Sequence, residues 1–241
     1  MESVAYLEVV RDRSAALLEA AQTDLGASVP SCPGWTVTDL LTHVGGIWGW
    51  AAAIVRTGDR ADLPSFTAGQ DGPALVAWAA EQASQLVSAL ENANPDSDCW
   101  TFGLPRSNRF WLRRQALETA VHAWDAQQAT ARQEPIGSDV AADGIGEYLA
   151  LTLPRRFRDH PDSWKGESLH LHRTDGEGEW MITLGPGAEL STENTHAKGD
   201  VALRGTASSL YLWCLNRVPL TDVEVFGDRD VALRWTAEIS F

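Results

Sequence analysis

The stretch Phe110-Trp-Leu-Arg-Arg-Gln-Ala-Leu-Glu-Thr-Ala-Val-His-Ala-Trp-Asp125 contains neither glycine nor proline and repeats its apolar residues at helical spacing. On such a helix Glu118, His122 and Asp125 fall within one narrow sector beside an apolar stripe. A carboxylate and an imidazole four residues apart can share one metal ion. They can also form an ordinary side-chain pair on a solvated face, with Arg114 as the salt-bridge partner of Glu118.

A second stretch that bears on the fold lies upstream. Ser31-Cys-Pro-Gly-Trp predicts a turn, and Thr36 predicts the N-cap of a helix over residues 37–56, with Asp39 completing a weak capping box. On this helix His43 shares an apolar face. A lone histidine there is more often a satisfied core residue than a ligand. Two helices of one bundle that both present such groups beside the core nevertheless indicate a shared metal site.

The rest of the first two thirds of the chain is also helical in pattern. The fourth helix extends over residues 108–131, and residues 57–72, rich in glycine and proline, predict a loop. In the second helix, Gly45-Gly46 removes side-chain bulk and allows a neighbouring helix to approach closely. The other helices expected cover residues 3–22, 74–91 and 139–158.

The pattern changes near Pro161, where apolar and polar residues begin to alternate. Residues 168–174 and 180–184, separated by Asp175-Gly-Glu-Gly, predict a β-hairpin. Further strands are expected at 200–204 and 223–226, and further helices at 207–216 and 228–239. We therefore predict an α+β protein of two domains, a helical bundle over residues 1–160 and a small α+β domain over residues 161–241.

Composition narrows the range of partners. A formal net charge of −14 disfavours a nucleic-acid surface, which needs a basic stripe, and adhesion to an anionic membrane. No apolar run approaches the length of a membrane span, and no N-terminal segment has the pattern of a signal peptide. The three cysteines suggest neither a disulfide framework nor a Cys-x-x-Cys site. We expect a cytoplasmic monomer or homodimer without nucleic-acid or membrane partners.

The remaining histidines give weaker signals. His170 and His172 would share one face of a strand, which is compatible with metal binding, but a half-exposed strand face is the favoured interpretation. His160 and His196 lie in stretches with the pattern of loops. Nucleophile-elbow, Walker-type and dinucleotide-binding motifs are all absent from the sequence.

Residues 31–46 resemble the second-helix entry of the mycothiol-dependent maleylpyruvate isomerase family, and residues 117–125 resemble its fourth-helix metal motif. The first domain is similar to DinB-like up-and-down four-helix bundles. Residues 199–228 resemble the family's C-terminal domain, which is similar to sterol carrier folds. The resemblance implies that His43, Glu118 and His122 bind a divalent metal, zinc in the first place and nickel as the alternative. Water or a thiol would take the open position.

The resemblance also implies a function, a cis-trans isomerase in which the metal activates mycothiol, a low-molecular-weight thiol, for addition to a small electrophile. The alternatives are a mycothiol S-transferase of detoxification or secondary metabolism, and a non-catalytic metal-binding module. Arg217 matches a C-terminal arginine that the isomerases use near the active site, although Asn216 stands where many relatives have glycine. We expect Arg217 and Asp125 to act in catalysis, Asp125 by orienting a metal ligand. Arg109 and Arg114 would bind the cosubstrate.

Overall fold

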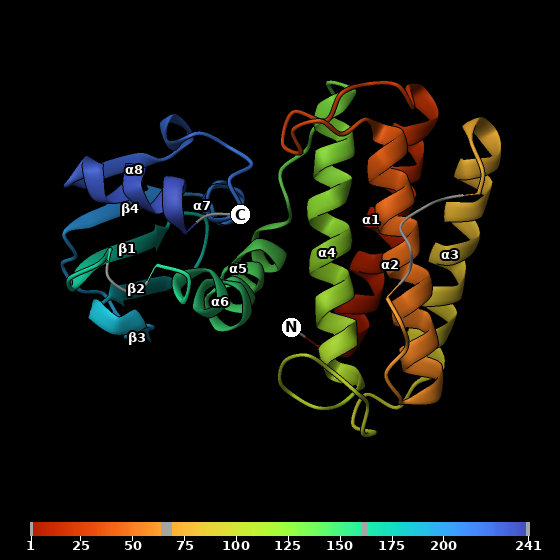
Figure 1. The fold of residues 1–241 in the computed structure, drawn as a ribbon, viewed down its shortest axis with the longest axis horizontal. Helices are drawn as coiled ribbons and strands as arrows, with labels where there is room; N and C mark the ends of the chain where they lie inside the picture. Colours follow the sequence, from red (N-terminus) through yellow and green to blue (C-terminus); the bar gives the residue numbers. More distant parts are fainter. Residues whose placement is uncertain (1, 64–68, 161–162, 240–241) are drawn as a thin grey trace. The chain divides into compact units, whose positions relative to one another are not determined.

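The computed structural model describes residues 2–63, 69–160 and 163–239, and it divides into two compact units, residues 1–134 and 135–241 (Figure 1). The first unit is helical. The second combines a five-stranded sheet with helices. This arrangement confirms the predicted fold class, a helical bundle followed by an α+β domain. Among the described residues, no helix is both long and apolar enough to cross a membrane.

The first unit is a bundle of four helices, each within a few residues of its expected position. Helix α1 packs mainly against α4, and α2 packs mainly against α3. The helices are α1 (Ser3–Thr23), α2 (Val37–Thr57), α3 (Gly72–Asn92) and α4 (Asn108–Ala129).

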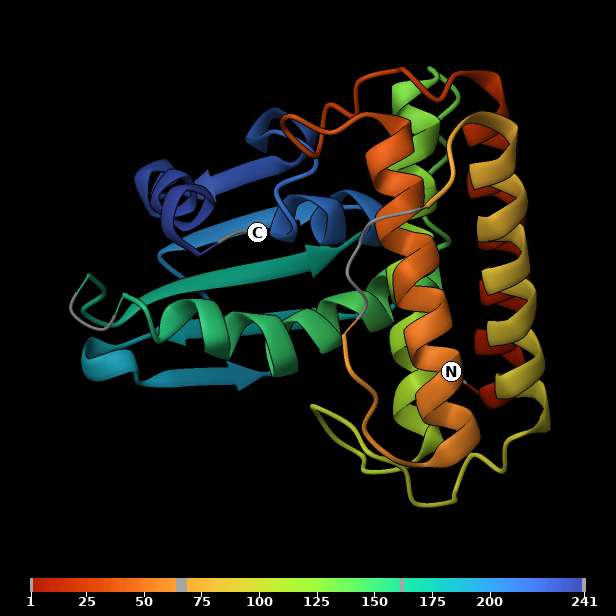
Figure 2. The same ribbon diagram turned by 45° about the vertical axis from the view of Figure 1, so that its right-hand side comes forward.

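The helices of the bundle do not strictly alternate in direction along the chain (Figure 2). Arg109 Nη1 donates to Ser3 Oγ at 3.5 Å, so α1 and α4 begin at the same end. Trp100 N donates to Gly58 O at 2.7 Å, which places the end of α2 at that end too. Asn108 Nδ2, at the start of α4, donates to Asn94 O just after α3 at 3.0 Å, so α3 also ends there. Helices α2 and α3 therefore run parallel, and the predicted up-and-down order does not hold between them.

Local sequence signals account for both ends of α2. Thr36 and Asp39 form the predicted capping box, with Thr36 N donating to Asp39 Oδ2 at 2.8 Å and Asp39 N donating to Thr36 Oγ1 at 3.4 Å. Before the helix, Gly34 has a φ of 86°, which confirms the predicted Pro-Gly turn. At its end, Gly58 has a φ of 77° and its N–H donates to Ile54 O at 2.7 Å.

Close packing sets the position of α2 against its neighbours. A Cβ on Gly45 would lie 2.5 Å from the Trp78 ring of α3, so the predicted close approach at this glycine is confirmed. Toward α4, the buried Trp48 donates from Nε1 to Thr119 Oγ1 at 3.0 Å. Because Thr119 follows Glu118 directly, this hydrogen bond holds the His43 face of α2 beside the Glu118 face of α4.

The second unit is built on a mixed sheet with strand order β3-β2-β1-β4-β5, in which β1 and β4 are parallel and the other neighbours antiparallel. Helices α7 and α8 pack on β1 and β4. The strands are β1 (Glu167–Arg173), β2 (Glu179–Leu184), β3 (Leu190–Glu193), β4 (Val201–Gly205) and β5 (Glu224–Gly227). The helices are α5 (Ser138–Glu147), α6 (Leu153–Phe157), α7 (Ala207–Cys214) and α8 (Arg229–Glu238).

Two features of this unit differ from the sequence expectation. Strand β3 was not expected, because it is short and mostly exposed and so has no apolar alternation. The helix expected over residues 139–158 is interrupted by a π-helical segment, Tyr148–Thr152. Pro154 follows this segment, and it cannot donate the backbone hydrogen bond of a regular helix. The hairpin between β1 and β2 is confirmed, whereas the likeness to sterol carrier folds stays a prediction.

The division between the units lies at Glu134 and Pro135, earlier than the boundary expected between residues 160 and 161. Helix α5 packs on α7 of the same unit, where Gly144 is so close to Tyr211 that a Cβ would lie 2.5 Å from its ring. Helical spacing alone does not show which domain a helix joins, so the sequence assigned α5 to the bundle. Residues 64–68 of the predicted loop and residues 161–162 lie outside the described part of the chain.

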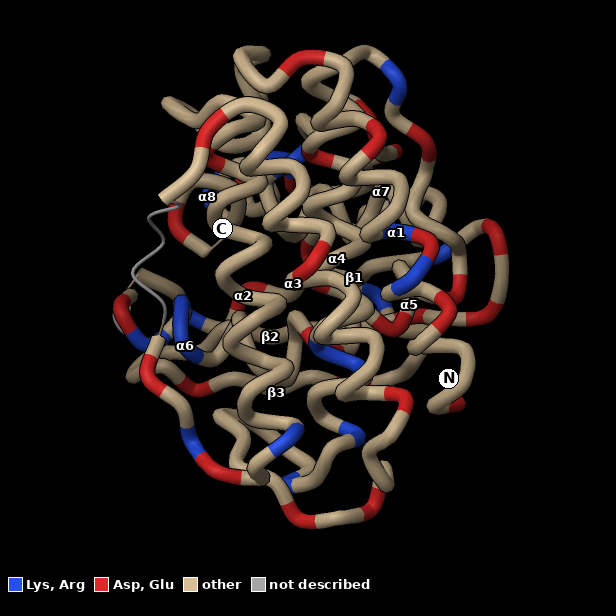
Figure 3. Tube along the Cα trace, turned by 90° about the vertical axis from the view of Figure 1, so that its right-hand side faces the viewer, with Lys and Arg blue, Asp and Glu red and all other residues tan. Residues whose placement is uncertain are grey.

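Charged residues are interspersed along both units. Figure 3 shows acidic and basic positions mixed on the side that faces the viewer.

Candidate metal centre

The first unit brings His43 of α2 together with Glu118 and His122 of α4. One ligand atom from each residue lies within 4.8 Å of the other two. His43 Nε2 lies 3.8 Å from Glu118 Oε1, and His122 Nε2 lies 3.1 Å from the same oxygen. The two imidazole rings meet edge to face, with their centroids 5.4 Å apart.

This set of donors fits a divalent transition metal. Two imidazole nitrogens and a carboxylate are donors that zinc and nickel accept. Bonds of about 2.1 Å in a tetrahedron place ligand atoms about 3.4 Å apart. The observed separations of 3.1 and 3.8 Å bracket that value. The three residues can therefore hold a metal ion after small side-chain movements, with one position left for a further ligand.

Asp125 lies behind His122, on the far side of its ring from the cluster. Its Oδ2 is 2.9 Å from His122 Nδ1, and its Oδ1 accepts a hydrogen bond of 2.6 Å from Ser31 Oγ. The Asp125 side chain is fully buried, so it is not an exposed helix charge. A proton held between Nδ1 and Asp125 leaves the Nε2 lone pair directed at Glu118 and His43.

Asp125 and Cys32 lie near the cluster and carry groups that could serve as a fourth protein ligand, but neither joins it. Asp125 is engaged with the opposite nitrogen of His122, and Cys32 Sγ contacts Asp125 Oδ2 at 4.0 Å. Within the described ranges, the metal-compatible group in this unit consists of the three residues His43, Glu118 and His122. Three protein ligands with an open position are typical of a catalytic metal site.

Arg114 forms the ion pair with Glu118 that the sequence suggested as the alternative to metal binding. The pair and the cluster coexist, because Arg114 contacts Oε2 and the histidines face Oε1. Burial by itself raises the pKa of Glu118, but the charges of Arg114 and His122 outweigh it and hold that pKa well below its usual range. Glu118 is therefore a carboxylate at neutral pH.

The pKa of His122 moves in the opposite direction. Burial by itself lowers this pKa, but the negative charge of Glu118 and the hydrogen bond to Asp125 raise it to about 9. Without a metal, His122 is protonated at neutral pH. A metal ion bound at Nε2 would take the place of that proton.

The two other cations assigned to the site belong to different parts of the chain. Arg109 is exposed and bonded to Asp96, with Nε 2.6 Å from Oδ1, and it lies about 13 Å before Glu118 along α4. It does not reach the cluster, because a regular helix keeps residues nine positions apart well separated. Arg217 belongs to the second unit, where it follows α7 and donates from Nη1 to Leu215 O at 2.8 Å. Asn216 before it has a φ of 58°, a left-handed conformation that explains why glycine is suited to this position.

Sequence reasoning missed two residues that shape the centre. Ser31 donates to Asp125, and the ring of Trp35 lies 5.2 Å from the ring of His43. Both belong to the turn before α2, which the sequence identified only as a helix boundary. Their proximity to α4 depends on packing between helices, for which the local pattern carries no signal.

Comparisons with known proteins agree with this architecture. Residues 7–127 match the mycothiol maleylpyruvate isomerase N-terminal domain, and residues 139–234 match the C-terminal domain of the same family. Two relatives are uncharacterized proteins from the CDC 1551 / Oshkosh and H37Rv strains of Mycobacterium tuberculosis. Each is 29% identical over 153 residues, which cover 60% of this chain and 76% of the relative.

Two crystal structures share the fold over 93% of both chains. One is a mycothiol-dependent maleylpyruvate isomerase, with a TM-score of 0.55 and 16% identity. The other is a histidine-to-alanine mutant of such an enzyme, with a TM-score of 0.59 and 14% identity. At these identities the likeness shows the fold, and the two domain matches show the family. The chain belongs to the mycothiol maleylpyruvate isomerase family.

Proposed function

We propose that this chain is a metal-dependent enzyme that uses mycothiol as cosubstrate to isomerise a small conjugated cis-alkene related to maleylpyruvate. The observation that carries the proposal is the cluster of His43, Glu118 and His122, in which three donors converge and one position stays open. Family membership supports mycothiol as the cosubstrate and a compound related to maleylpyruvate as the substrate.

Each residue of the centre has a distinct task in this proposal. His43, Glu118 and His122 would hold the metal ion, and Asp125 would keep His122 in the tautomer that presents Nε2. Arg114 would hold Glu118 by Oε2 and leave Oε1 for the metal, which makes it a positioning residue. When bound, a divalent metal supplies the positive charge that keeps a thiol in its thiolate form at neutral pH.

The isomerisation itself is a chemistry of the cosubstrate sulfur. The thiolate of mycothiol would add to the cis double bond, the resulting single bond would rotate, and elimination would return the thiol and the trans product. Arg217 is the cation that the family resemblance assigns to a substrate carboxylate. Nothing in the three ligand residues selects one electrophile, and an S-transferase would use the same centre but release the adduct.

The test is an assay of a conjugated cis substrate with the metal-loaded enzyme, in the presence and absence of mycothiol. We expect the absorbance change to require mycothiol, and mass spectrometry to show a product of the same mass as the substrate, with no thiol attached. Turnover that is independent of thiol would contradict the proposal. A stable thiol adduct as the product would replace the isomerase by the S-transferase.

A further inference from the structure

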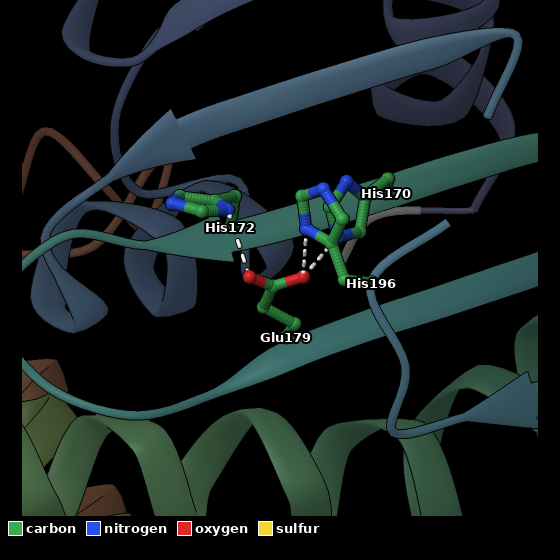
Figure 4. Close-up of side chains that lie close together, drawn as sticks. All are labelled: His170, His172, Glu179 and His196. Atoms are coloured by element: carbon green, nitrogen blue, oxygen red, sulfur yellow. Dashed lines mark hydrogen bonds and ion pairs between the residues drawn. The ribbon is translucent and has the colours of Figure 1, made fainter. Parts of the chain in front are cut away.

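A second group of metal-ligating side chains lies on the sheet of the second unit (Figure 4). His170 and His172 come from β1, Glu179 begins β2, and His196 lies in the connection between β3 and β4. One ligand atom from each of the four residues lies within 4.8 Å of the other three. All four belong to the same compact unit, so the cluster is defined by this unit alone.

The three imidazoles surround a single carboxylate. His170 Nε2 lies 3.1 Å from Glu179 Oε2, and His172 Nδ1 lies 3.1 Å from Oε1. His196 Nδ1 lies 2.5 Å from Oε2. The ring centroids of the three histidines are 5.4 to 6.0 Å apart, and Figure 4 shows the rings on one side of the carboxylate. Three nitrogen donors and one oxygen donor therefore enclose one small volume.

The sheet fixes three of the four donors. His170 and His172 are two residues apart and so share one face of β1. Glu179 is the direct antiparallel partner of His172, and partners in register place their side chains on the same face. The hydrogen-bonded ladder between β1 and β2 thus brings two imidazoles and the carboxylate together before any ion is present.

The fourth donor arrives on an anchored segment. Asp200, which ends the connection that carries His196, accepts hydrogen bonds at Oδ2 from Ser168 N at 2.8 Å and from Ser168 Oγ at 2.7 Å. Gly199 passes so close to β1 that a Cβ would lie 3.3 Å from His170 N. The connection is therefore attached to β1 beside the histidines, and His196 lies next to the buried His170.

We propose that His170, His172, Glu179 and His196 bind one divalent transition metal ion, with Zn²⁺ as the test ion. Four protein donors of this type complete a tetrahedral zinc site without a solvent position, which is typical of a structural site. Bonds of about 2.1 Å require ligand atoms about 3.4 Å apart. His172 and His196 are 32% and 76% exposed, so their side chains have room to turn to that spacing.

Metal binding at this cluster is expected to affect the stability of the second unit. A bound ion would link the connection between β3 and β4 to strands β1 and β2, and so stabilise the second unit against unfolding. This inference does not depend on the proposed enzymatic function, because no residue of the bundle takes part in it.

The experiment uses the full chain with the first centre removed by His43→Ala, stripped of metal and titrated with Zn²⁺ by calorimetry. We expect one ion per chain and a rise in the melting temperature of the second unit. Adding His196→Ala or His172→Ala should weaken zinc binding at least about tenfold, since even the loss of an outer-shell partner costs about 10- to 100-fold. His160→Ala, in the same unit but outside the cluster, is the matched control and should bind zinc unchanged.

His196 is exposed, so its replacement should leave the fold intact and keep the test readable. Circular dichroism of the stripped variants checks this directly. Absence of stoichiometric zinc binding to the His43→Ala variant would overturn the proposal. Equal zinc affinity in the His196→Ala, His172→Ala and His160→Ala backgrounds would overturn it as well.

Discussion

The two clusters of metal-compatible residues in this chain differ in what surrounds their donors. In the bundle, three donors converge, and the outer positions are filled by Asp125 and Arg114, which orient them from behind. On the sheet, three histidines converge on Glu179 to give four donors, and three of the four belong to a single strand pair. The number of protein donors and the presence of outer partners separate a centre suited to chemistry from one suited to stability.

The largest effect is expected from a substitution that disrupts the bundle cluster and leaves the sheet cluster intact. Glu118→Gln removes the carboxylate that both histidines face and should lower thiol-dependent turnover about a thousandfold or more, since a bound metal contributes several kcal/mol. Steady-state kinetics and metal analysis of the same preparations measure it. Glu81→Gln, an exposed helix substitution, is the control. Turnover within tenfold of the wild type would remove Glu118 from the centre.

A smaller effect is expected from the outer partner of His122. Asp125→Asn keeps the size of the side chain but removes the negative charge behind Nδ1, and it should weaken metal binding about 10- to 100-fold. Competition with a chromophoric chelator measures the affinity. If Asp125→Asn binds metal as tightly as the wild type, Asp125 has a structural role through Ser31 and does not tune the centre.

The pH dependence of metal binding sharpens the same comparison. Because the pKa of His122 is raised to about 9 in the metal-free protein, a metal ion must displace one proton below that pH. Affinity at the first centre should rise about tenfold per pH unit up to about pH 9 and then level off. Calorimetry in buffers of different ionisation enthalpy counts the released proton. Affinity that does not change between pH 7 and 9 would contradict the assignment of His122.

The same shift affects the stability of the metal-free protein. A pKa raised in the folded state contributes stability that is complete below about pH 6.5 and lost as the pH rises through about 9. The free energy of unfolding should therefore fall over this window, by at most about 3 kcal/mol from His122. Urea unfolding of the stripped protein at the two ends of the window measures it. In His122→Gln the free energy of unfolding should lose this part of its pH dependence. A pH dependence equal to that of the wild type would contradict the raised pKa of His122.

The smallest effect concerns the contact that aligns the two helices. Thr119→Val removes the acceptor of the buried Trp48 N–H at nearly constant volume and should cost about 1 to 3 kcal/mol of stability. Because this contact holds α2 beside α4, metal affinity at the first centre should fall slightly and zinc binding on the sheet should not change. Denaturant unfolding measures the loss of stability, and zinc titration measures the affinities of the two centres. A loss of stability below 0.5 kcal/mol would show that packing alone aligns the helices.

Local patterns predicted much of what positions the first centre. Helical spacing predicted the shared face of Glu118 and His122, and the capping box at Thr36 predicted where the His43 helix begins. Long-range packing was not predictable, because the contact of Ser31 with Asp125 joins residues far apart in the chain. The parallel course of α2 and α3 was missed for the same reason.

The second cluster shows the limit of periodicity in a sheet. Strand spacing predicted the common face of His170 and His172, but the favoured interpretation was a half-exposed surface. The register between β1 and β2 places Glu179 beside the two histidines, and the connection after β3 brings His196 to Glu179. Neither Glu179 nor His196 lies in a recognisable sequence motif. The sequence therefore did not predict that the four residues come together.

The most direct test is the metal content of two untagged proteins, the single variant His196→Ala and the double variant His43→Ala/His196→Ala. The shared His196→Ala substitution removes metal binding at the sheet cluster from both. We predict about one ion per chain in His196→Ala and the loss of most of it in the double variant. Equal metal content in the two proteins would contradict this prediction, because the ion would then not depend on His43.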